Sequence, residues 1–205
     1  MPVRIADDVF SIAVPDANAA QTLAARLRQA VGLDEIVAGL DSVCVQFDPG
    51  LMPSEQAMSM IEDALRSCAS AEVEGTRAVI EIPVWYGGEH GPDLAHVCET
   101  VGLSESQFIE RHKAPDYAVE MIGFTPGFAY LGGLQEALSV PRLGTPRVRV
   151  PAGSIGVSGL YCGLYAMAGP GGWPIIGRTD AAVFDASKPD PFLLHPGRKV
   201  RFVNP

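Results

Sequence analysis

The sequence has no basic cluster and no long hydrophobic run, and each absence excludes a class of protein. It carries 15 Lys and Arg against 24 Asp and Glu, which gives a formal net charge of −9. Proteins that bind nucleic acid usually concentrate Lys and Arg on one face, and here the nearest approach to a cluster is Arg142, Arg147 and Arg149. No stretch reaches the roughly 18 apolar residues that a membrane span needs. We therefore expect neither nucleic acid nor a membrane as a partner.

The signals of an exported or disulfide-bonded protein are also missing. The first residues, Met1-Pro-Val-Arg-Ile-Ala-Asp-Asp, carry acids early and lack the apolar core of a signal peptide. The cysteines Cys44, Cys68, Cys98 and Cys162 lack the paired spacing of a zinc site or of thioredoxin-like redox chemistry. We expect reduced thiols, mostly buried, in a cytoplasmic protein without a metal site.

The motifs of self-sufficient catalysts do not occur either. The sequence has no Walker-type Gly-rich Lys loop, no G-x-S-x-G elbow and no H-E-x-x-H pair. It has no Met-Lys-Met for biotin attachment. What it has is 205 residues, 47% of them hydrophobic and 19% charged, which is ordinary for a soluble protein with one large or two small domains.

Residues 1–81 predict a small domain of alternating strands and helices. Asp16 and Ser54 can cap two helices, and Gly32 is the expected end of the first. The expected helices cover 19–31 and 54–67, and the expected strands cover 9–14, 35–40, 42–47 and 78–84. The resulting order, β-α-β-β-α-β, is that of a ferredoxin-like domain. Nothing in it indicates chemistry, so we expect an accessory or interface domain.

Residues 82–205 differ, because Gly and Pro recur throughout. Two short helices are expected over 92–101 and 104–112, the first ended by Gly102 and the second begun by Ser104. From Tyr117 onward short apolar segments of period two alternate with turns, which indicates a closed or nearly closed β structure. The predicted fold class is α+β, and Tyr86–Thr179 is the expected functional region.

The first candidate constellation is Tyr86-Gly-Gly-Glu-His-Gly-Pro-Asp, which lies between a strand and a helix. Glycines such as Gly88 let the backbone approach a ligand, and a helix N-terminus favours an anion. Glu89 and His90 would lie at the rim, where His90 can transfer protons near neutral pH. A tight turn whose polar residues cap the helix fits the same spacing, and from spacing alone that reading has the advantage.

The second constellation is aromatic. Phe124, Phe128 and Tyr130 interleave with glycine and proline, which suits a ligand pocket or a partner's groove. A loop that simply closes one end of a barrel explains the pattern equally well.

The third constellation combines arginines with Gly- and Pro-rich turns. Arg147 and Arg178 can hold a carboxylate or phosphate with two hydrogen bonds each. Ser154, between two glycines, can donate a hydrogen bond, and Trp173 follows Pro170-Gly-Gly. Arginines on exposed strands are more often solvated than functional, and the Pro and Gly residues on both sides raise the functional interpretation above that base rate.

The motifs occur in a series that resembles the family of 5-oxoprolinase B subunits, also described as Kip-type sensor-kinase inhibitor and allophanate hydrolase subunit 1. They are Val45-Gln-Phe-Asp-Pro, Ile82-Pro-Val-x-Tyr-Gly-Gly-Glu-x-Gly-Pro-Asp-Leu, Gly123-Phe-x-Pro-Gly-Phe-x-Tyr-Leu, Pro141-Arg, Thr145-Pro-Arg, Val150-Pro-Ala-Gly-Ser, Pro170-Gly-Gly-Trp, Ile176-Gly-Arg-Thr and Leu194-x-Pro-Gly-x-x-Val-x-Phe. Several motifs in fixed order are far more specific than any one of them.

The resemblance implies a cyclophilin-like β-barrel of the carboxyltransferase type after the N-terminal domain. It implies one component of an enzyme that also needs a homologous C subunit and an A subunit to open 5-oxoproline to glutamate with ATP hydrolysis. Inhibition of a sensor histidine kinase, or a urea carboxylase or allophanate role, are the alternatives. Carried onto this sequence, the catalytic residues are His90, Glu89 and Arg147; the substrate-binding residues are Tyr86, Gly88, Phe124, Tyr130, Ser154 and Arg178; the partner-binding residues are Phe124, Phe128, Tyr130 and Trp173.

Three positions depart from the family pattern. Cys162 and Ala166 stand where Thr-Gly-Ile-Tyr-Pro is usual, and Gly169 stands where Ser is usual before Pro-Gly-Gly-Trp. We expect these changes to remove two hydroxyl donors and to loosen a turn, which bears on substrate choice but not on the fold.

Overall fold

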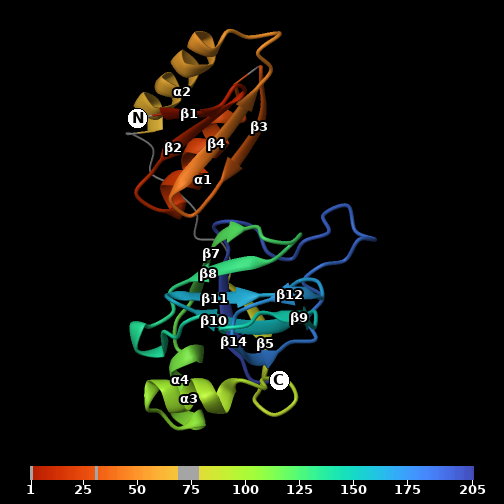
Figure 1. The fold of residues 1–205 in the computed structure, drawn as a ribbon. Coiled ribbons are helices and arrows are strands. Elements are labelled where there is room, and N and C mark those ends of the chain that lie inside the picture. Colours follow the sequence, from red (N-terminus) through yellow and green to blue (C-terminus); the bar gives the residue numbers. More distant parts are fainter. Residues whose placement is uncertain (1, 31, 69–78) are drawn as a thin grey trace. The chain divides into compact units, whose positions relative to one another are not determined.

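The computed structural model describes residues 2–30, 32–68 and 79–205, and the chain divides into two compact units, Met1–Thr76 and Arg77–Pro205 (Figure 1). Each unit has a hydrophobic core of its own. The first core contains residues such as Phe10, Val45 and Ile61, and the second contains residues such as Tyr117, Leu164 and Phe202.

The first unit is a four-stranded antiparallel sheet with two helices. Its sheet order is β1-β2-β4-β3. The elements are β1 (Pro2–Ala6), β2 (Val9–Ala13), α1 (Ala17–Leu27), β3 (Leu33–Ala38), β4 (Ser42–Phe47) and α2 (Ser54–Cys68). Alternate residues of β2 and β4 are buried against the helices, as period two requires.

The ferredoxin-like order expected from the sequence is wrong. The described elements of this unit run β-β-α-β-β-α, with β1 as a strand that the pattern did not predict. The strand expected over 78–84 is β5 (Val79–Pro83), but it pairs with β14 (Lys199–Val203) in the other unit's sheet. A strand's own sequence does not specify a partner about 120 residues away, which is why pattern alone misassigned it.

Helix α1 begins as predicted but ends early. The Asp16 side chain accepts a hydrogen bond from Ala19 N at 2.8 Å, so it is the N-cap. The helix stops at Leu27 rather than at Gly32. Gly32, with φ of 101°, instead lies where a Cβ would be 2.6 Å from the Met52 side chain. Its lack of a side chain therefore serves the packing of the turn into β3.

The second unit is built on an eight-stranded sheet of order β5-β14-β7-β8-β11-β10-β13-β6. Its remaining strands are β6 (Trp85–Tyr86), β7 (Tyr117–Ile122), β8 (Ala129–Gly132), β10 (Ser154–Ser158), β11 (Tyr161–Leu164) and β13 (Ile175–Arg178). The two edge strands, β5 and β6, are separated in the chain by Val84 alone. The sheet therefore curls round until its edges meet, which gives a nearly closed barrel.

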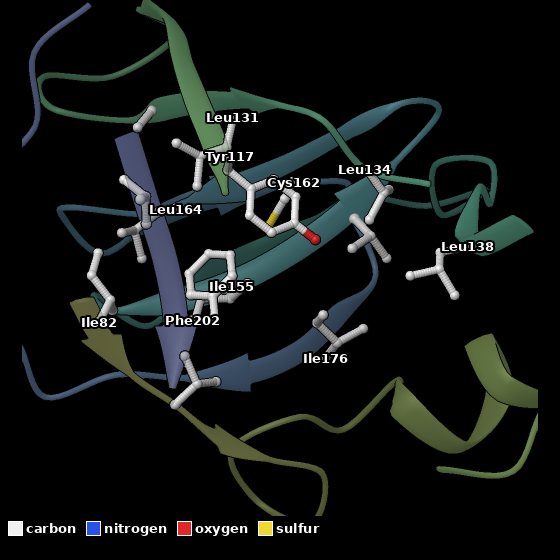
Figure 2. Packing of buried hydrophobic residues seen from close by; sticks show 14 of the residues in the cluster. Ile82, Tyr117, Leu131, Leu134, Leu138, Ile155, Cys162, Leu164, Ile176 and Phe202 are labelled. Atoms are coloured by element: carbon white, nitrogen blue, oxygen red, sulfur yellow. The ribbon is translucent and has the colours of Figure 1, made fainter. Parts of the chain in front are cut away.

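The barrel interior is filled by one face of every strand. Figure 2 shows ten labelled side chains of this cluster converging between the strands, among them Ile82, Leu131, Cys162 and Ile176. All four are fully buried. The nearly closed β structure predicted from Tyr117 onward is thereby confirmed.

A two-stranded ribbon and two helices complete the unit. The ribbon pairs β9 (Arg147–Val150) with β12 (Gly169–Gly171), and a single 3₁₀ turn covers Glu136–Leu138. The helices α3 (Leu94–Val101) and α4 (Glu105–Lys113) lie together at one end of the sheet (Figure 1). Gly102 ends α3 with φ of 69°, and Ser104 forms the predicted capping box. Within the described residues, no helix is both long and apolar enough to cross a membrane.

Candidate functional site

The loop from Gly87 to Asp93 is fixed against strand β13 by the backbone. Gly87 N donates to Ile176 O at 3.1 Å, and Asp93 N donates to Ile175 O at 3.0 Å. A Cβ on Gly91 would collide with the carbonyl of Ile176, so only glycine permits this close approach. The glycines of the motif therefore serve a rigid turn laid along the neighbouring strand.

This docking corrects one expectation about the loop. The N–H groups of His90 and Gly91 donate to Gly87 O at 3.1 and 2.9 Å, and that of Asp93 is used by Ile175. Pro92 has no N–H. Only the N–H groups of Gly88 and Glu89 lack an intramolecular partner within the described residues. The loop is therefore not the array of free donors that an anion-binding turn requires.

Glu89 and His90 project from this rigid turn toward solvent. Their side chains are 90% and 38% exposed, and His90 Nε2 lies 3.9 Å from Glu89 Oε1. The His90 ring lies 6.1 Å from the ring of Trp85, which is 37% exposed. An exposed acid and an exposed imidazole on a fixed backbone are available to a substrate held by another surface.

Three residues form one row across strands β6, β13 and β10. Trp85 is directly opposite Arg178, and Arg178 is directly opposite Ser154. Directly opposite residues of antiparallel strands share a face, so Trp85, whose ring lies near that of His90, is on the same face as the predicted pair Arg178 and Ser154. Arg178 Nε donates to Ala152 O at 3.1 Å, and Ser154 is buried. Trp85 was missed by the sequence analysis, although its place between the inward-facing Val84 and Tyr86 marks it as outward-facing.

Arg147 is joined to the same loop by an ion pair. Its Nη2 donates to Asp93 Oδ1 at 2.6 Å, and the other oxygen, Oδ2, accepts from Ile175 N at 2.6 Å. The Asp93 side chain is 13% exposed and that of Arg147 is 33% exposed. Asp93 was not predicted as a functional residue. It connects the loop, strand β13 and the β9–β12 ribbon at a single carboxylate.

Aromatic rings cover the outer face of the barrel near this ion pair. The Phe128 ring contacts Tyr130, Tyr165 and Trp173 at 4.9, 4.8 and 5.7 Å. A Cβ on Gly163 would be 2.7 Å from Phe128 and 2.8 Å from Trp173. The glycine in β11 therefore lets the rings lie directly on the sheet.

Burial sorts the predicted aromatic residues into two groups. Phe128 and Trp173 are buried, so neither side chain is available to a partner on this surface, against expectation. Tyr130 is half-buried, and burial raises the pKa of its phenol while the charge of Arg142 lowers it. Burial likewise raises the pKa of Tyr165, against a hydrogen bond with the Trp173 backbone and, more weakly, the charges of Arg142 and Arg147.

Phe124 is the exposed member of the aromatic set, at 60%. Thr125 N donates to Gly123 O at 2.8 Å, which closes a γ-turn around Phe124. Its φ of 67° is the single positive value for a non-glycine residue in the described part of the chain. The Thr125 hydroxyl is buried without a hydrogen-bond partner there. A strained turn that exposes a phenyl ring is typical of a ligand or partner contact.

Tyr86, the last residue of β6 and directly before the Gly87–Asp93 loop, points inward. Its hydroxyl lies 2.8 Å from Nδ1 of His112, which is fully buried among Phe108, Tyr117 and Phe202. Burial raises the pKa of Tyr86 and lowers that of His112 to about 3. Contrary to expectation, Tyr86 therefore anchors the loop to the core and does not face a substrate.

The three departures from the family pattern lie in different environments. Cys162 is fully buried in the barrel interior, where burial raises the pKa of its thiol. A hydroxyl there would face the core and not a ligand, so that expectation is corrected. A Cβ on Gly169 would meet open space. Of the two positions that lack the family's hydroxyl, 162 and 169, only position 169 could therefore present a donor to a ligand. Ala166 lies against Gly127 in the turn that carries Phe124.

Comparison with known proteins shows which family this chain resembles. A family model for the carboxyltransferase domain, subdomain C and D, matches residues 5–194. The chain is 44% identical to the B subunit of 5-oxoprolinase from Escherichia coli O157:H7 over 182 residues, which are 88% of this chain and 82% of that protein. The chain belongs to the family of 5-oxoprolinase B subunits.

Other similar proteins agree with this membership. The 5-oxoprolinase B subunit of Bacillus subtilis (strain 168) is 42% identical over 151 residues, 74% of this chain and 62% of that protein. The crystal structure of TTHA0988 matches 99% of the chain with a TM-score of 0.82 and 33% identity, but the match spans only 40% of TTHA0988. Kluyveromyces lactis urea carboxylase matches at a TM-score of 0.77 and 16% identity over 21% of its length, which shows a shared fold alone.

Proposed function

We propose that this chain is one subunit of an ATP-dependent 5-oxoprolinase, which converts 5-oxo-L-proline, ATP and water to L-glutamate, ADP and phosphate. Its partners in this proposal are a homologous C subunit and an A subunit, in the cytoplasm, and its second unit is a cyclophilin-like barrel. The observation that carries the proposal is the similarity to proteins named as the B subunit of 5-oxoprolinase, at 39–44% identity over most of the chain.

The site's geometry suits one part of this reaction. Opening a lactam requires a proton donor for the departing nitrogen, and His90 is an exposed imidazole on a rigid turn beside Glu89. The substrate also carries a carboxylate, and two cationic groups belong to this region: Arg178, opposite Trp85, and Arg147, paired with Asp93. An open surface of this kind can form one wall of a site that a second subunit completes.

The proposal assigns no ATP site to this chain. The sequence has no Walker-type loop, and most N–H groups of the Gly87–Asp93 turn are already bonded within the protein. The residues present do not fit a phosphate cradle, so we derive no step through ATP on this surface. Groups that handle phosphate are expected on the partner subunits.

Variants of the reconstituted complex test the site. His90→Ala should lower kcat about 10²-fold or more, because a positioned acid–base group supplies roughly that factor. Arg147→Ala should lower activity as well, because it removes the partner of Asp93. His195→Ala is the matched control, since His195 is 39% exposed and paired with Asp190 outside this surface. Wild-type rates in both the His90 and Arg147 variants would refute the site.

A second candidate function is inhibition of a sensor histidine kinase by direct binding. The observation that favours it is the strained, exposed Phe124, which suits contact with a helix or groove. An autophosphorylation assay with the cognate kinase tests it. Inhibition by the wild-type protein that is lost in Phe124→Ala is expected, and no inhibition at micromolar protein removes this candidate.

A further inference from the structure

The two arginines predicted to hold the substrate's carboxylate are already engaged within the chain. Arg147 is balanced by Asp93 at 2.6 Å, in a place where both side chains are largely buried. Arg178 donates through Nε to the carbonyl of Ala152. A carboxylate that approached Arg147 would compete with Asp93 and would meet its negative charge. Each arginine thus already has an intramolecular partner, although Arg147 Nη1 is buried without a hydrogen-bond partner within the described residues.

Arg142 lies beside the same surface without such a partner. It is exposed, and no hydrogen bond or ion pair involves it within the described residues. The next residue, Leu143, donates its N–H to Gly172 O at 2.7 Å, directly before Trp173. The Trp173 ring in turn contacts the Tyr130 ring at 5.7 Å. The backbone therefore fixes Arg142 at the rim of the aromatic layer.

The electrostatics agree with this placement. The positive charge of Arg142 lowers the pKa of both Tyr130 and Tyr165, which agrees with its place at the rim of the aromatic layer. Tyr130 is half-buried, so part of its side chain remains exposed at this rim. A cation beside apolar rings is screened less than one in open water, so it attracts an anion more strongly.

We propose that Arg142 binds the carboxylate of the substrate, a small cyclic carboxylic acid whose ring packs on Tyr130, while Asp93 holds Arg147 as a positioning residue. This inference rests on the proposed function of the site and adds the residue that recognises the acid. It predicts that specificity for a carboxylated lactam resides in the Pro141–Arg142 turn.

Steady-state kinetics of the reconstituted complex test the proposal. Arg142→Gln should raise KM for 5-oxoproline about 10- to 100-fold, the range that a charge-assisted hydrogen bond supplies, with kcat within about 3-fold of wild type. Arg142→Lys should restore most of the affinity. Arg149→Gln is the matched control, because Arg149 is also exposed and its replacement removes the same charge.

A ligand without the carboxylate separates binding of the acid from general damage. 2-Pyrrolidinone should compete equally weakly in wild type and in Arg142→Gln, whereas 5-oxoproline should bind the wild type more tightly. Saturation-transfer NMR on the same complexes reports this binding without requiring turnover.

The outcomes are distinguishable. If the wild-type complex binds 5-oxoproline but forms no glutamate, the proposed function fails and the NMR comparison still decides the role of Arg142. If Arg142→Gln behaves like Arg149→Gln, or if only Arg147→Gln raises KM, the assignment to Arg142 is overturned. Absence of 5-oxoproline binding to the wild type overturns both.

Discussion

His112 is the residue whose surroundings differ most from those of an ordinary histidine. It is fully buried, its Nδ1 lies 2.8 Å from the Tyr86 hydroxyl, and its Nε2 has no hydrogen-bond partner within the described residues. The groups facing it are the rings of Phe108, Tyr117 and Phe202, none of which is charged at neutral pH. Burial without a counter-charge favours the neutral imidazole, which is why its pKa falls to about 3.

This burial predicts a pH dependence of stability. The unfolded chain binds a proton at His112 near pH 6.5, whereas the folded chain binds one only near pH 3. The free energy of unfolding is therefore unaffected by this proton above pH 6.5, and it decreases as the pH falls below 6.5, because the proton favours the unfolded chain. Between these values the free energy of unfolding should fall by up to ~1.4 kcal/mol per pH unit. Urea unfolding between pH 4 and 7 should show a shallower dependence in His112→Phe than in wild type. An equal slope in the two proteins would contradict the assignment.

Gly91 provides a second prediction at this scale. A Cβ there would collide with the carbonyl of Ile176, so Gly91→Ala must displace the loop. We expect a loss of about 1–3 kcal/mol in the free energy of unfolding, together with lower activity of the complex. Gly88→Ala is the control, since position 88 has a positive φ but open space around it, and should cost about 1 kcal/mol. Equal costs in the two variants would show that the collision is relieved elsewhere.

At the scale of elements, the β7–β8 turn exposes an aromatic ring from a strained backbone. Glycine at position 124 would relieve that strain and remove the ring, whereas alanine would remove the ring alone. We expect Phe124→Gly to be more stable than Phe124→Ala by about 1 kcal/mol in thermal unfolding. Both variants should bind the partner subunit, or the kinase, less tightly than wild type. Undiminished binding by both would leave Phe124 with no role in docking.

The elements also show what the sequence could and could not predict. Ser104 and Gly102 specified the helix ends correctly, because capping depends on neighbours within one turn. The partner of β5 could not be predicted, because the pairing with β14 is set by closure of the whole sheet. The Asp93–Arg147 pair was missed for the same reason, since 54 residues separate its members. Helix ends could therefore be predicted from neighbouring residues, whereas pairs between residues far apart in the sequence could not.

At the scale of the molecule, β14 holds the second unit together. It is the last described strand in the chain, and in the sheet it lies between β5, with which it pairs in parallel, and β7, with which it pairs antiparallel. Phe202 is buried in the same interior as Tyr117 and Ile82 (Figure 2), and Val200 belongs to the same cluster. We therefore expect the core of the barrel to depend on β14.

Substitution in β14 tests this dependence. Phe202→Ala should lower the free energy of unfolding by about 3–5 kcal/mol, because it leaves a cavity beneath His112 and Tyr117. Lys199→Ala, at an exposed position of the same strand, should change it by less than about 0.5 kcal/mol. Chemical denaturation of both variants provides the measurement. A small effect of Phe202→Ala would mean that β14 is not part of the cooperative core.

In the proposed function, this chain is an essential but incomplete part of a 5-oxoprolinase. The most direct measurement is glutamate formation from 5-oxoproline and ATP with the chain alone, with the A and C subunits alone, and with all three together. We predict glutamate only when all three are present, with loss of the activity in His90→Ala. Glutamate formation by the A and C subunits without this chain, or none by the complete set, would contradict the account.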